Sequence, residues 1–311
     1  MRMTHGIRAA ANEKHVFSKE IAAQVRRIEL RTRGLVESLF SGEYHSVFKG
    51  RGLEFSDVRE YQPGDDVRAI DWNVTARRGR PFVKEYVEER ELTALLVVDL
   101  SASKDFGTGT TSNAAIASEI AAILTFAAAG NNDRVGLILV TDRVELFVPP
   151  DSGRRHSMRL VMELLTFRPL GRGTKLSAAL EYALRVLHRR AAIFVVSDFL
   201  MDGATDPDLA RAARRLCRDH DVVSIRLTDL AGDDLPDVGL LALVDPETGE
   251  RRVIDTSRRV RAAYRERKVA QRAEITALFR ELRQDAVEVH TDEDYVPALI
   301  RFFRRRERAS R

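Results

Sequence analysis

The chain has 311 residues, of which 44% are hydrophobic and 32% are charged, so it holds enough apolar material for one large domain or two modest ones. Its formal net charge is only +4, whereas general nucleic-acid binders usually carry a stronger and more concentrated basic excess, so the charge balance is uninformative about a polyanionic partner. Cys217 is the single cysteine, which excludes an intrachain disulfide and a cysteine metal cage and favours a reducing compartment.

Two segments bear on location. Residues 1–15 contain no apolar stretch that could serve as a signal peptide. Residues 114–130 are the most apolar part of the chain, but they are rich in alanine and interrupted by Ser118 and Glu119. This composition predicts a core helix rather than a membrane span, and we expect a cytoplasmic protein without a membrane span.

The first part of the chain shows three patterns. Residues 1–17 are predicted to be a disordered leader. From Ser18 to about Phe40 apolar residues recur at helical spacing, which predicts an amphipathic helix with Ser18 as its N-cap. In residues 42–91, glycines and prolines separate short segments rich in Phe, Tyr and Val, which predicts strands and turns rather than helices. We therefore expect a helix and a β-rich module over residues 18–91.

A different pattern starts at Leu92. Residues 92–100 form a continuous apolar run that ends around Asp99, typical of a strand buried on both faces. Short strands then alternate with helices, which predicts an α/β domain over residues 92–305 with a mainly parallel sheet covered by helices on both faces. The further predicted strands are 134–140, 145–148, 191–196, 222–227 and 286–290, and the predicted helices are 112–129, 154–166, 176–188, 207–219, 258–284 and 294–305.

Two segments depart from this alternation. Leu240–Val244 and Arg251–Asp255 flank the turn sequence Asp-Pro-Glu-Thr-Gly, which predicts a hairpin. We expect this hairpin, over residues 238–256, to complete the β-rich module. The arginine-rich residues 306–311 are predicted to be a basic tail, which more often marks a solvated helix end than a nucleic-acid site.

Oxygen-bearing side chains stand at three places where the predicted sheet meets its connections. Asp99-Leu100-Ser101-Ala102-Ser103 closes the first strand, Ser197-Asp198 follows the strand 191–196, and Gly171-Arg172-Gly173-Thr174 leads into a helix. Ligands of an open parallel sheet bind at the carboxyl ends of its strands, so these side chains can converge on one rim. The predicted metal ligands are Asp99, Ser101, Ser103, Thr174 and Asp198.

The residue types of this set indicate its chemistry. Two carboxylates and three hydroxyls form a hard oxygen site that suits Mg²⁺, and also Mn²⁺ or Ca²⁺, better than zinc. Five side chains, some acting through water, leave one position of an octahedral ion open, and an acidic residue of another protein can fill it. The set therefore predicts metal-dependent protein binding rather than catalysis.

Two alternatives stay open. One is a Mg²⁺-dependent phosphoryl-transfer or hydrolytic enzyme that uses the same carboxylates, with Lys104 or Lys175 as the nearby phosphate-binding candidates. The other is a structural adaptor with an empty site, in which Asp and Ser only cap helices and end strands. The scattered histidines and the lack of a P-loop motif argue against a zinc hydrolase and a nucleotide hydrolase.

Residues 50–78 gather charges of both signs around Trp72. We interpret this stretch as a partly buried ion-pair network that joins two domains. The alternative is an interaction surface, because Trp and Arg are common binding anchors. A cation at Asp65-Asp66 is a lesser hypothesis, since no further ligands follow in local spacing.

These motifs resemble known families. Residues 92–228 look like a von Willebrand factor A-like domain with a complete metal-ion-dependent adhesion site. Residues 50–77, which include Arg59-Glu60-Tyr61-Gln62-Pro63-Gly64-Asp65-Asp66 and Asp71-Trp72, resemble the bacterial family called domain of unknown function 58 (DUF58), whose pattern extends over residues 18–305. That resemblance implies a MoxR-type AAA+ ATPase as partner, in chaperone-like maturation of a client protein. By position it also implies direct metal contacts from Ser101, Ser103 and Thr174, with Asp99 and Asp198 acting mainly through water.

Overall fold

The computed structural model describes residues 23, 25–30, 54–87, 92–101, 112–171, 173–199, 206–229, 232, 234–244 and 250–310. The chain divides into two compact units. The larger unit comprises Met1–Phe48 and Leu92–Arg311, and the smaller unit comprises Lys49–Glu91.

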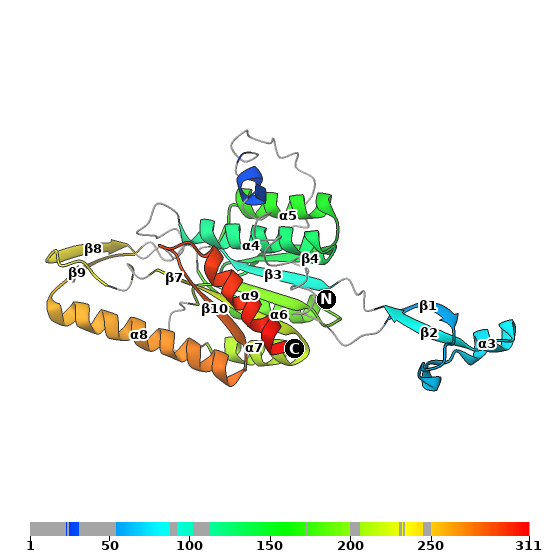
Figure 1. The fold of residues 1–311 in the computed structure, drawn as a ribbon. Helices are drawn as coiled ribbons and strands as arrows, with labels where there is room; N and C mark the ends of the chain where they lie inside the picture. The colour runs from blue at the N-terminus through cyan, green and yellow to red at the C-terminus, as the bar shows by residue number, and fades with distance from the viewer. Residues whose placement is uncertain are drawn as a thin grey trace, which may run out of the picture. The chain divides into compact units, whose positions relative to one another are not determined.

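The larger unit is built around a six-stranded sheet with the strand order β10-β7-β6-β3-β4-β5 (Figure 1). Neighbouring strands are parallel except β4 and β5, which pair antiparallel. The inner strands are continuous apolar runs because both of their faces are covered. The strands are β3 (Thr93–Asp99), β4 (Arg134–Val140), β5 (Val144–Asp151), β6 (Ala192–Ser197), β7 (Asp221–Thr228) and β10 (Asp285–His290).

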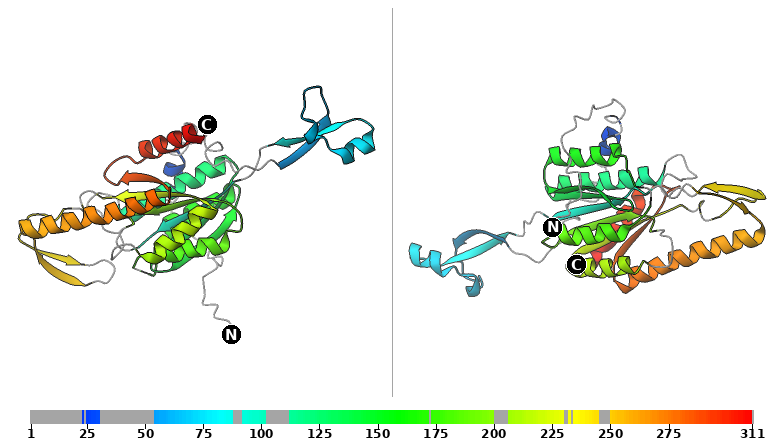
Figure 2. Two further views of the ribbon diagram at one scale, coloured as in Figure 1. Left: turned by 90° about the horizontal axis from the view of Figure 1, so that it is seen from below. Right: turned by 180° about the vertical axis from the view of Figure 1, so that it is seen from behind.

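Helices pack on both faces of this sheet (Figure 2). In β3, Leu96 and Val98 belong to one core layer while Leu95 and Val97 belong to the other, because successive side chains of a strand point to opposite faces. The first layer contains α4 (Asn113–Gly130), α5 (Arg154–Thr166) and α9 (Val296–Ser310), and the second contains α6 (Leu176–Val186), α7 (Pro207–Asp219) and the end of α8 (Arg258–Glu281).

The helix α4 is long and apolar enough, by length and composition, to cross a membrane. In this fold 67% of it is buried, and it packs between β3, β4 and α5. Its apolar residues therefore serve the core of the larger unit, as the alanine-rich sequence predicts. Val25 and Ile28, in the described helical stretch 25–30, join the same core layer.

The strands and helices predicted after Leu92 all occur, with small shifts of their ends. The predicted basic tail is an exception, because α9 continues to Ser310 and residue 306 already lies inside it. Arg306 pairs with Asp221, and its Nε lies 3.2 Å from the Asp285 carboxylate. This arginine therefore helps to fasten α9 to the start of β7 and β10.

The predicted hairpin also occurs, as β8 (Leu240–Val244) and β9 (Arg251–Asp255). Among the described residues β8 and β9 pair only with each other, and they belong to the larger unit. A hairpin signal in a sequence gives the turn and the pairing partner but no information about the sheet that the hairpin joins.

The smaller unit contains β1 (Glu54–Glu60) and β2 (Phe82–Val87), paired antiparallel. The expectation that residues 42–91 contain no helices is wrong, because a 3-10 turn η1 (Val67–Ala69) and a helix α3 (Trp72–Arg78) lie between the strands. The Asp71 carboxylate accepts hydrogen bonds from the first backbone N–H groups of α3, and Gly79 ends the helix in a left-handed conformation with φ of 70°. Local capping therefore forms this helix without a long apolar stripe.

The charges of the smaller unit interact locally. Arg59 donates two hydrogen bonds to the Asp65 carboxylate, at 2.6 and 2.7 Å. These bonds and the backbone N–H of Gln62 lower the pKa of Asp65 to about 2. Asp66 caps η1. Both carboxylates of the Asp65-Asp66 pair are thus engaged within the unit, which argues against a cation there.

Candidate metal centre

Asp99 is the last residue of β3 and its side chain is fully buried. Its Oδ1 accepts a hydrogen bond of 3.0 Å from the backbone N–H of Ser101, and its Oδ2 accepts one of 2.6 Å from the Ser197 hydroxyl. The bond to Ser101 folds the chain back directly after the strand. The orientation of the Asp99 carboxylate is therefore set from two strands, β3 and β6.

Asp198 follows the last residue of β6, the strand next to β3, and it is also buried. The residue after it, Phe199, has a positive φ of 55°, which is rare for a bulky side chain. Two contacts hold this conformation: the Phe199 N–H donates to the Ser197 hydroxyl at 3.0 Å, and the Phe199 ring packs edge-on against Phe279 at 5.1 Å. Asp198 thus lies in a tightly held turn at the carboxyl end of β6.

Thr174 lies in the loop that leads into α6. Hydrogen bonds hold this loop at the end of β4, which pairs with β3 on the side opposite β6. The Lys175 N–H donates to the Thr141 carbonyl at 2.8 Å, one residue beyond β4. The Glu145 carboxylate accepts from the Gly171 N–H at 2.6 Å and from the Thr141 hydroxyl at 2.9 Å. These bonds bring the loop to the same edge of the sheet as Asp99.

Gly171 allows this close approach. A Cβ at this position would lie 1.9 Å from Oδ1 of Asp142 and 2.3 Å from the hydroxyl of Thr141, so a larger residue fits only if these two side chains move. The Gly-x-Gly-Thr motif therefore has a steric role at its first glycine. That role is to bring the chain against the end of β4.

Four of the five predicted ligands can be placed. All four lie at the carboxyl edge of the sheet: Asp99 ends β3 and Ser101 follows it, Asp198 follows β6, and Thr174 lies in the loop bonded to the end of β4. Ser101 is buried. Ser103 lies outside the described residues, as does Lys104.

The donors at this edge fit a hard cation. Two carboxylates and two hydroxyls are oxygen ligands, and three of these four side chains are buried. Two further oxygens, Ser177 Oγ in the first turn of α6 and Asn113 Oδ1 at the start of α4, are buried without a hydrogen-bond partner among the described residues. Buried polar atoms are nearly always satisfied in folded proteins, so such atoms near a helix start are consistent with a polar ligand or water close by.

The site differs from a carboxylate-rich metal cluster. Within the described ranges no three His, Cys, Asp or Glu side chains are grouped to hold a metal. The predicted set contains only two carboxylates, and its other donors are hydroxyl groups. The arrangement thus resembles a site in which part of the coordination is left to water or to an incoming ligand.

Two residues of this edge have supporting roles that the sequence did not predict, although Ser197 was already placed at the end of its strand. Ser197 holds the Asp99 carboxylate, and Glu145 holds the loop that carries Thr174. Ser197 was open to prediction, because parallel pairing of β3 with β6 places it beside Asp99. No sequence pattern predicted the role of Glu145, since a single acid on an edge strand is usually solvated.

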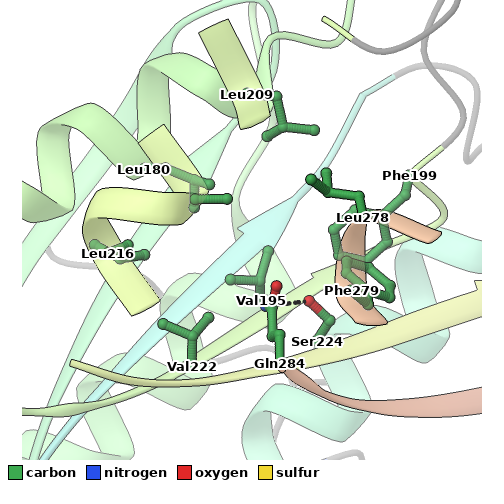
Figure 3. Close-up of a pocket in the computed structure, with 11 residues that line it drawn as sticks. Leu180, Val195, Phe199, Leu209, Leu216, Val222, Ser224, Leu278, Phe279 and Gln284 are labelled. Atoms are coloured by element: carbon green, nitrogen blue, oxygen red, sulfur yellow. Dashed lines mark hydrogen bonds between the residues drawn. The ribbon is translucent and has the colours of Figure 1, made fainter. Parts of the chain in front are cut away.

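An apolar pocket lies between α6, α7, the end of α8 and the sheet, and Phe199 from the turn of Asp198 is one of its lining residues (Figure 3). Its polar groups are already satisfied, because the Gln284 side chain donates a 2.7 Å hydrogen bond to the Ser224 hydroxyl. The other lining side chains are aliphatic or aromatic. This pocket therefore belongs to the packing of the second core layer.

Comparison with known proteins gives a family. The family described as protein of unknown function DUF58 matches residues 57–274. An uncharacterised protein of Mycobacterium tuberculosis is 32% identical over 293 residues, which are 94% of this chain and 91% of that protein. The uncharacterised protein YeaD of Bacillus subtilis is 39% identical over 51 residues, 16% of this chain and 13% of its own.

Solved structures give more distant likenesses. BatB from Bacteroides thetaiotaomicron has a TM-score of 0.44 at 15% identity and covers 70% of this chain and 99% of its own. A von Willebrand factor type A structure from Catenulispora acidiphila has a TM-score of 0.34 at 14% identity and covers 48% of this chain and 35% of its own. Such values concern the fold alone. The family match is the stronger finding, and by it this chain belongs to the DUF58 family.

Proposed function

We propose that this protein is a metal-dependent protein-binding module, with a von Willebrand factor A-like domain that holds one Mg²⁺-type ion at Asp99, Ser101, Ser103, Thr174 and Asp198. The observation that carries the proposal is the placement of two buried carboxylates at neighbouring strand ends. The loop of Thr174 is held at the strand on the other side. Two buried carboxylates so near one another are costly unless cations or hydrogen bonds compensate them.

The residues of the chain do the positioning. Ser197 and the Ser101 N–H orient the Asp99 carboxylate, and Glu145 fixes the loop that presents Thr174. A bound Mg²⁺ would supply a positive centre with one open coordination position, which favours a carboxylate oxygen of a partner. The module would therefore recognise an acidic residue on another protein. We also propose a MoxR-type AAA+ ATPase as the partner, in maturation of a client protein, and the support for this is the family membership.

The first test is metal binding by calorimetry with Mg²⁺ and Mn²⁺. Thr174→Val removes one hydroxyl with little change of shape, and Asp198→Asn removes one charge. We expect either change to weaken binding about tenfold or more, because changes even around a metal site commonly have that effect. Thr93→Val, at the opposite end of β3, is the matched control and should leave binding unchanged.

The second test is binding of the purified MoxR-type ATPase to the immobilised chain. Thr174→Val should reduce capture at constant Mg²⁺, while Thr93→Val should not. Comparing variants at constant Mg²⁺ avoids removing Mg²⁺ from the ATPase itself. The proposal fails if the folded chain binds no divalent ion, or if Thr174→Val captures the ATPase as well as the unchanged chain does.

A further inference from the structure

The β8–β9 hairpin and the first turns of α8 lie side by side, away from the central sheet (Figures 1 and 2). We call residues 238–244 and 250–268 the arm. Its position follows from one anchor: Arg226, two residues before the end of β7, donates to Thr276 Oγ1 at 3.0 Å and to the Arg272 carbonyl at 3.4 Å. The residues of α8 before Arg272 therefore extend about 20 Å, at 1.5 Å per residue, toward and beyond the carboxyl ends of the strands.

One face of the hairpin carries four uncovered apolar side chains, with Arg251 and Asp255 at its two ends. Leu240, Ala242 and Val244 alternate along β8, and Val253 stands opposite Ala242 on the same face. Leu240 is 75% exposed, Val253 67% and Val244 40%. The other face includes the half-buried cross-strand pair Leu241 and Ile254. Because β8 and β9 pair only with each other in the part of the chain that is described, this small sheet also has open edges.

Three cations without an ion pair to a described residue belong to the arm, and one of them, Arg251, stands opposite Val244 on this face. Arg258 and Arg259 begin α8, Arg251 begins β9, and all three are exposed and make no ion pair with a described residue. The first turn of α8 contains no acidic residue, although the positive end of the helix dipole favours one there. The cationic start of the helix therefore costs stability, and a negatively charged partner would remove that cost.

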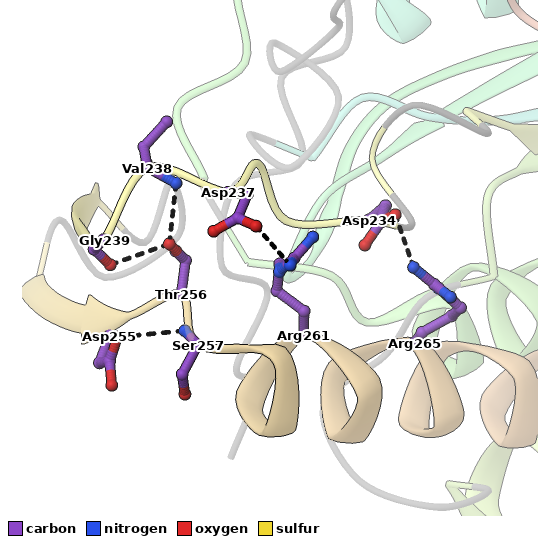
Figure 4. Close-up of polar contacts among 9 residues, drawn as sticks. All are labelled: Asp234, Asp237, Val238, Gly239, Asp255, Thr256, Ser257, Arg261 and Arg265. Atoms are coloured by element: carbon purple, nitrogen blue, oxygen red, sulfur yellow. Dashed lines mark hydrogen bonds and ion pairs between the residues drawn. The ribbon is translucent and has the colours of Figure 1, made fainter.

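The two next arginines differ, because they hold the arm together (Figure 4). Arg261 pairs with Asp237 at 2.6 Å and Arg265 pairs with Asp234 at 2.7 Å. In the same region the Thr256 hydroxyl donates to the Gly239 carbonyl at 2.8 Å and accepts from the Val238 N–H at 3.1 Å. These bonds join the start of α8 and the residues just before it to the loop that precedes the hairpin, so the hairpin is held beside α8.

The charges and the apolar face together select one kind of occupant. A second copy of the chain would bring the same arginines together. Nucleic acid would leave the apolar face uncovered. An anionic membrane would leave the open edges of the β8–β9 sheet without hydrogen-bond partners. An acidic peptide with alternating apolar side chains satisfies both features, because an added strand presents every second side chain to the same face.

We propose that the arm is a second docking surface, which binds an extended acidic segment of a partner protein. The apolar side chains of that segment pack on Leu240, Val244 and Val253, and its carboxylates pair with Arg251, Arg258 and Arg259. This surface is separate from the metal centre, and its binding does not require a metal.

The test uses two fluorescein-labelled synthetic peptides, one alternating Val with Glu and the other alternating Val with Lys. Fluorescence anisotropy with the full chain should show binding of the Glu peptide only. Arg258→Glu combined with Arg259→Glu should weaken that binding about tenfold or more and should create binding of the Lys peptide. Binding of the Lys peptide by this variant would show that the variant is folded.

Matched controls separate recognition from general charge. Arg189→Glu with Arg190→Glu makes the same charge change at another exposed arginine pair, and it should leave binding of the Glu peptide within about twofold, since distant exposed charges are screened by salt.

Leu240→Ser with Val253→Thr should weaken binding about tenfold, because hydrophobic anchors carry much of an interface's energy. Leu30→Ser, at a side chain 59% exposed, is the apolar control. Thr174→Val should bind the Glu peptide unchanged, which separates this proposal from the metal centre.

Three results would overturn the proposal. The first is equal binding of the Glu and Lys peptides, and the second is loss of binding in both arginine-pair variants alike. The third is absence of Glu-peptide binding while phosphatidylcholine–phosphatidylglycerol vesicles or a single-stranded RNA bind to the unchanged chain and not to the Arg258→Glu, Arg259→Glu variant. That third result would assign the arm to a lipid surface or to nucleic acid instead.

Discussion

The carboxyl rim of the sheet and the arm stand near the same edge of the larger unit, but different forces order them. At the rim, Asp99, Ser101 and Asp198 are buried and their surroundings are packed by two core layers. In the arm, most side chains are exposed and the contacts that join its parts are ion pairs and a few hydrogen bonds. The rim is thus suited to hold ligands in fixed geometry, and the arm to adapt to a partner.

The same contrast between packed and exposed residues occurs along the single helix α8. The last turns of α8 bury Ile275, Leu278 and Phe279 in the second core layer, whereas its first four turns contain no buried residue. Burial of apolar surface stabilises a helix far more than exposed ion pairs do. We therefore expect changes in the two halves of α8 to differ strongly in their effect on the free energy of unfolding.

The largest expected effect is at Phe279. Phe279→Ala removes a buried ring that packs on Phe199 at 5.1 Å and should lower the free energy of unfolding by about 3–5 kcal/mol. Val269→Ala, on the same helix at a side chain 59% exposed, should change it by less than about 0.5 kcal/mol. Urea denaturation followed by circular dichroism measures both values. Similar losses for the two variants would contradict the division of α8 into a packed and an exposed half.

The next effect is at the loop of Thr174. Gly171→Ala places a Cβ within 2.3 Å of the Thr141 hydroxyl and should cost about 1–3 kcal/mol of stability, as overpacking does. The Thr141 hydroxyl that must move also bonds to Glu145, which holds the loop of Thr174, so the affinity for Mg²⁺ should fall as well. Gly232→Ala is the control, since its Cβ would meet no atom closer than 3.5 Å. An unchanged metal affinity in a folded Gly171→Ala protein would show that the loop position does not matter to the centre.

The rim could be predicted from the sequence because its physics is local and regular. Continuous apolar runs such as residues 92–100 mark buried strands, and the rule that ligands gather at carboxyl ends then placed Asp99 and Asp198 at one edge. The residues that support these carboxylates and the loop of Thr174 were harder to predict. Ser197 follows from strand register, but the contact of Glu145 with Gly171 depends on how a loop folds over the end of β4, which no local pattern encodes.

The arm and the smaller unit were predicted less well for a related reason. The hairpin was recognised from its turn sequence, but nothing in Leu240–Asp255 showed that it would stand beside α8 rather than join β1 and β2. The helix α3 was missed because its order comes from two caps, Asp71 and Gly79, and not from apolar periodicity. Where burial does not impose a period, sequence patterns indicate elements but not their neighbours.

A smaller effect, again tied to burial, concerns His220 at the end of α7. Burial lowers the pKa of His220 below its usual value of 6.5, the charge of Asp219 opposes this shift, and the charge of Arg190 adds to it. The unfolded chain therefore binds the proton more readily, so this contribution to stability is complete above about pH 6.5 and is lost as the pH falls through the lower folded pKa. His220→Gln should flatten the loss of stability below pH 6.5, as measured by urea denaturation at several pH values. An unchanged slope would contradict the shift.

The smallest global effect is expected in the arm. Arg261→Gln and Arg265→Gln each break an exposed ion pair and should change the free energy of unfolding by less than about 1 kcal/mol. Hydrogen exchange of the β8 and β9 amides should nevertheless become faster, because these pairs fasten the hairpin to α8 while the core remains folded. Arg214→Gln is the matched control, since it breaks the pair with Glu281 at the packed end of α8. If Arg214→Gln accelerated hydrogen exchange in β8 and β9 as much as the two arm variants do, the order of the arm would depend on the core of the sheet. The proposed contrast between the carboxyl rim and the arm would then be wrong.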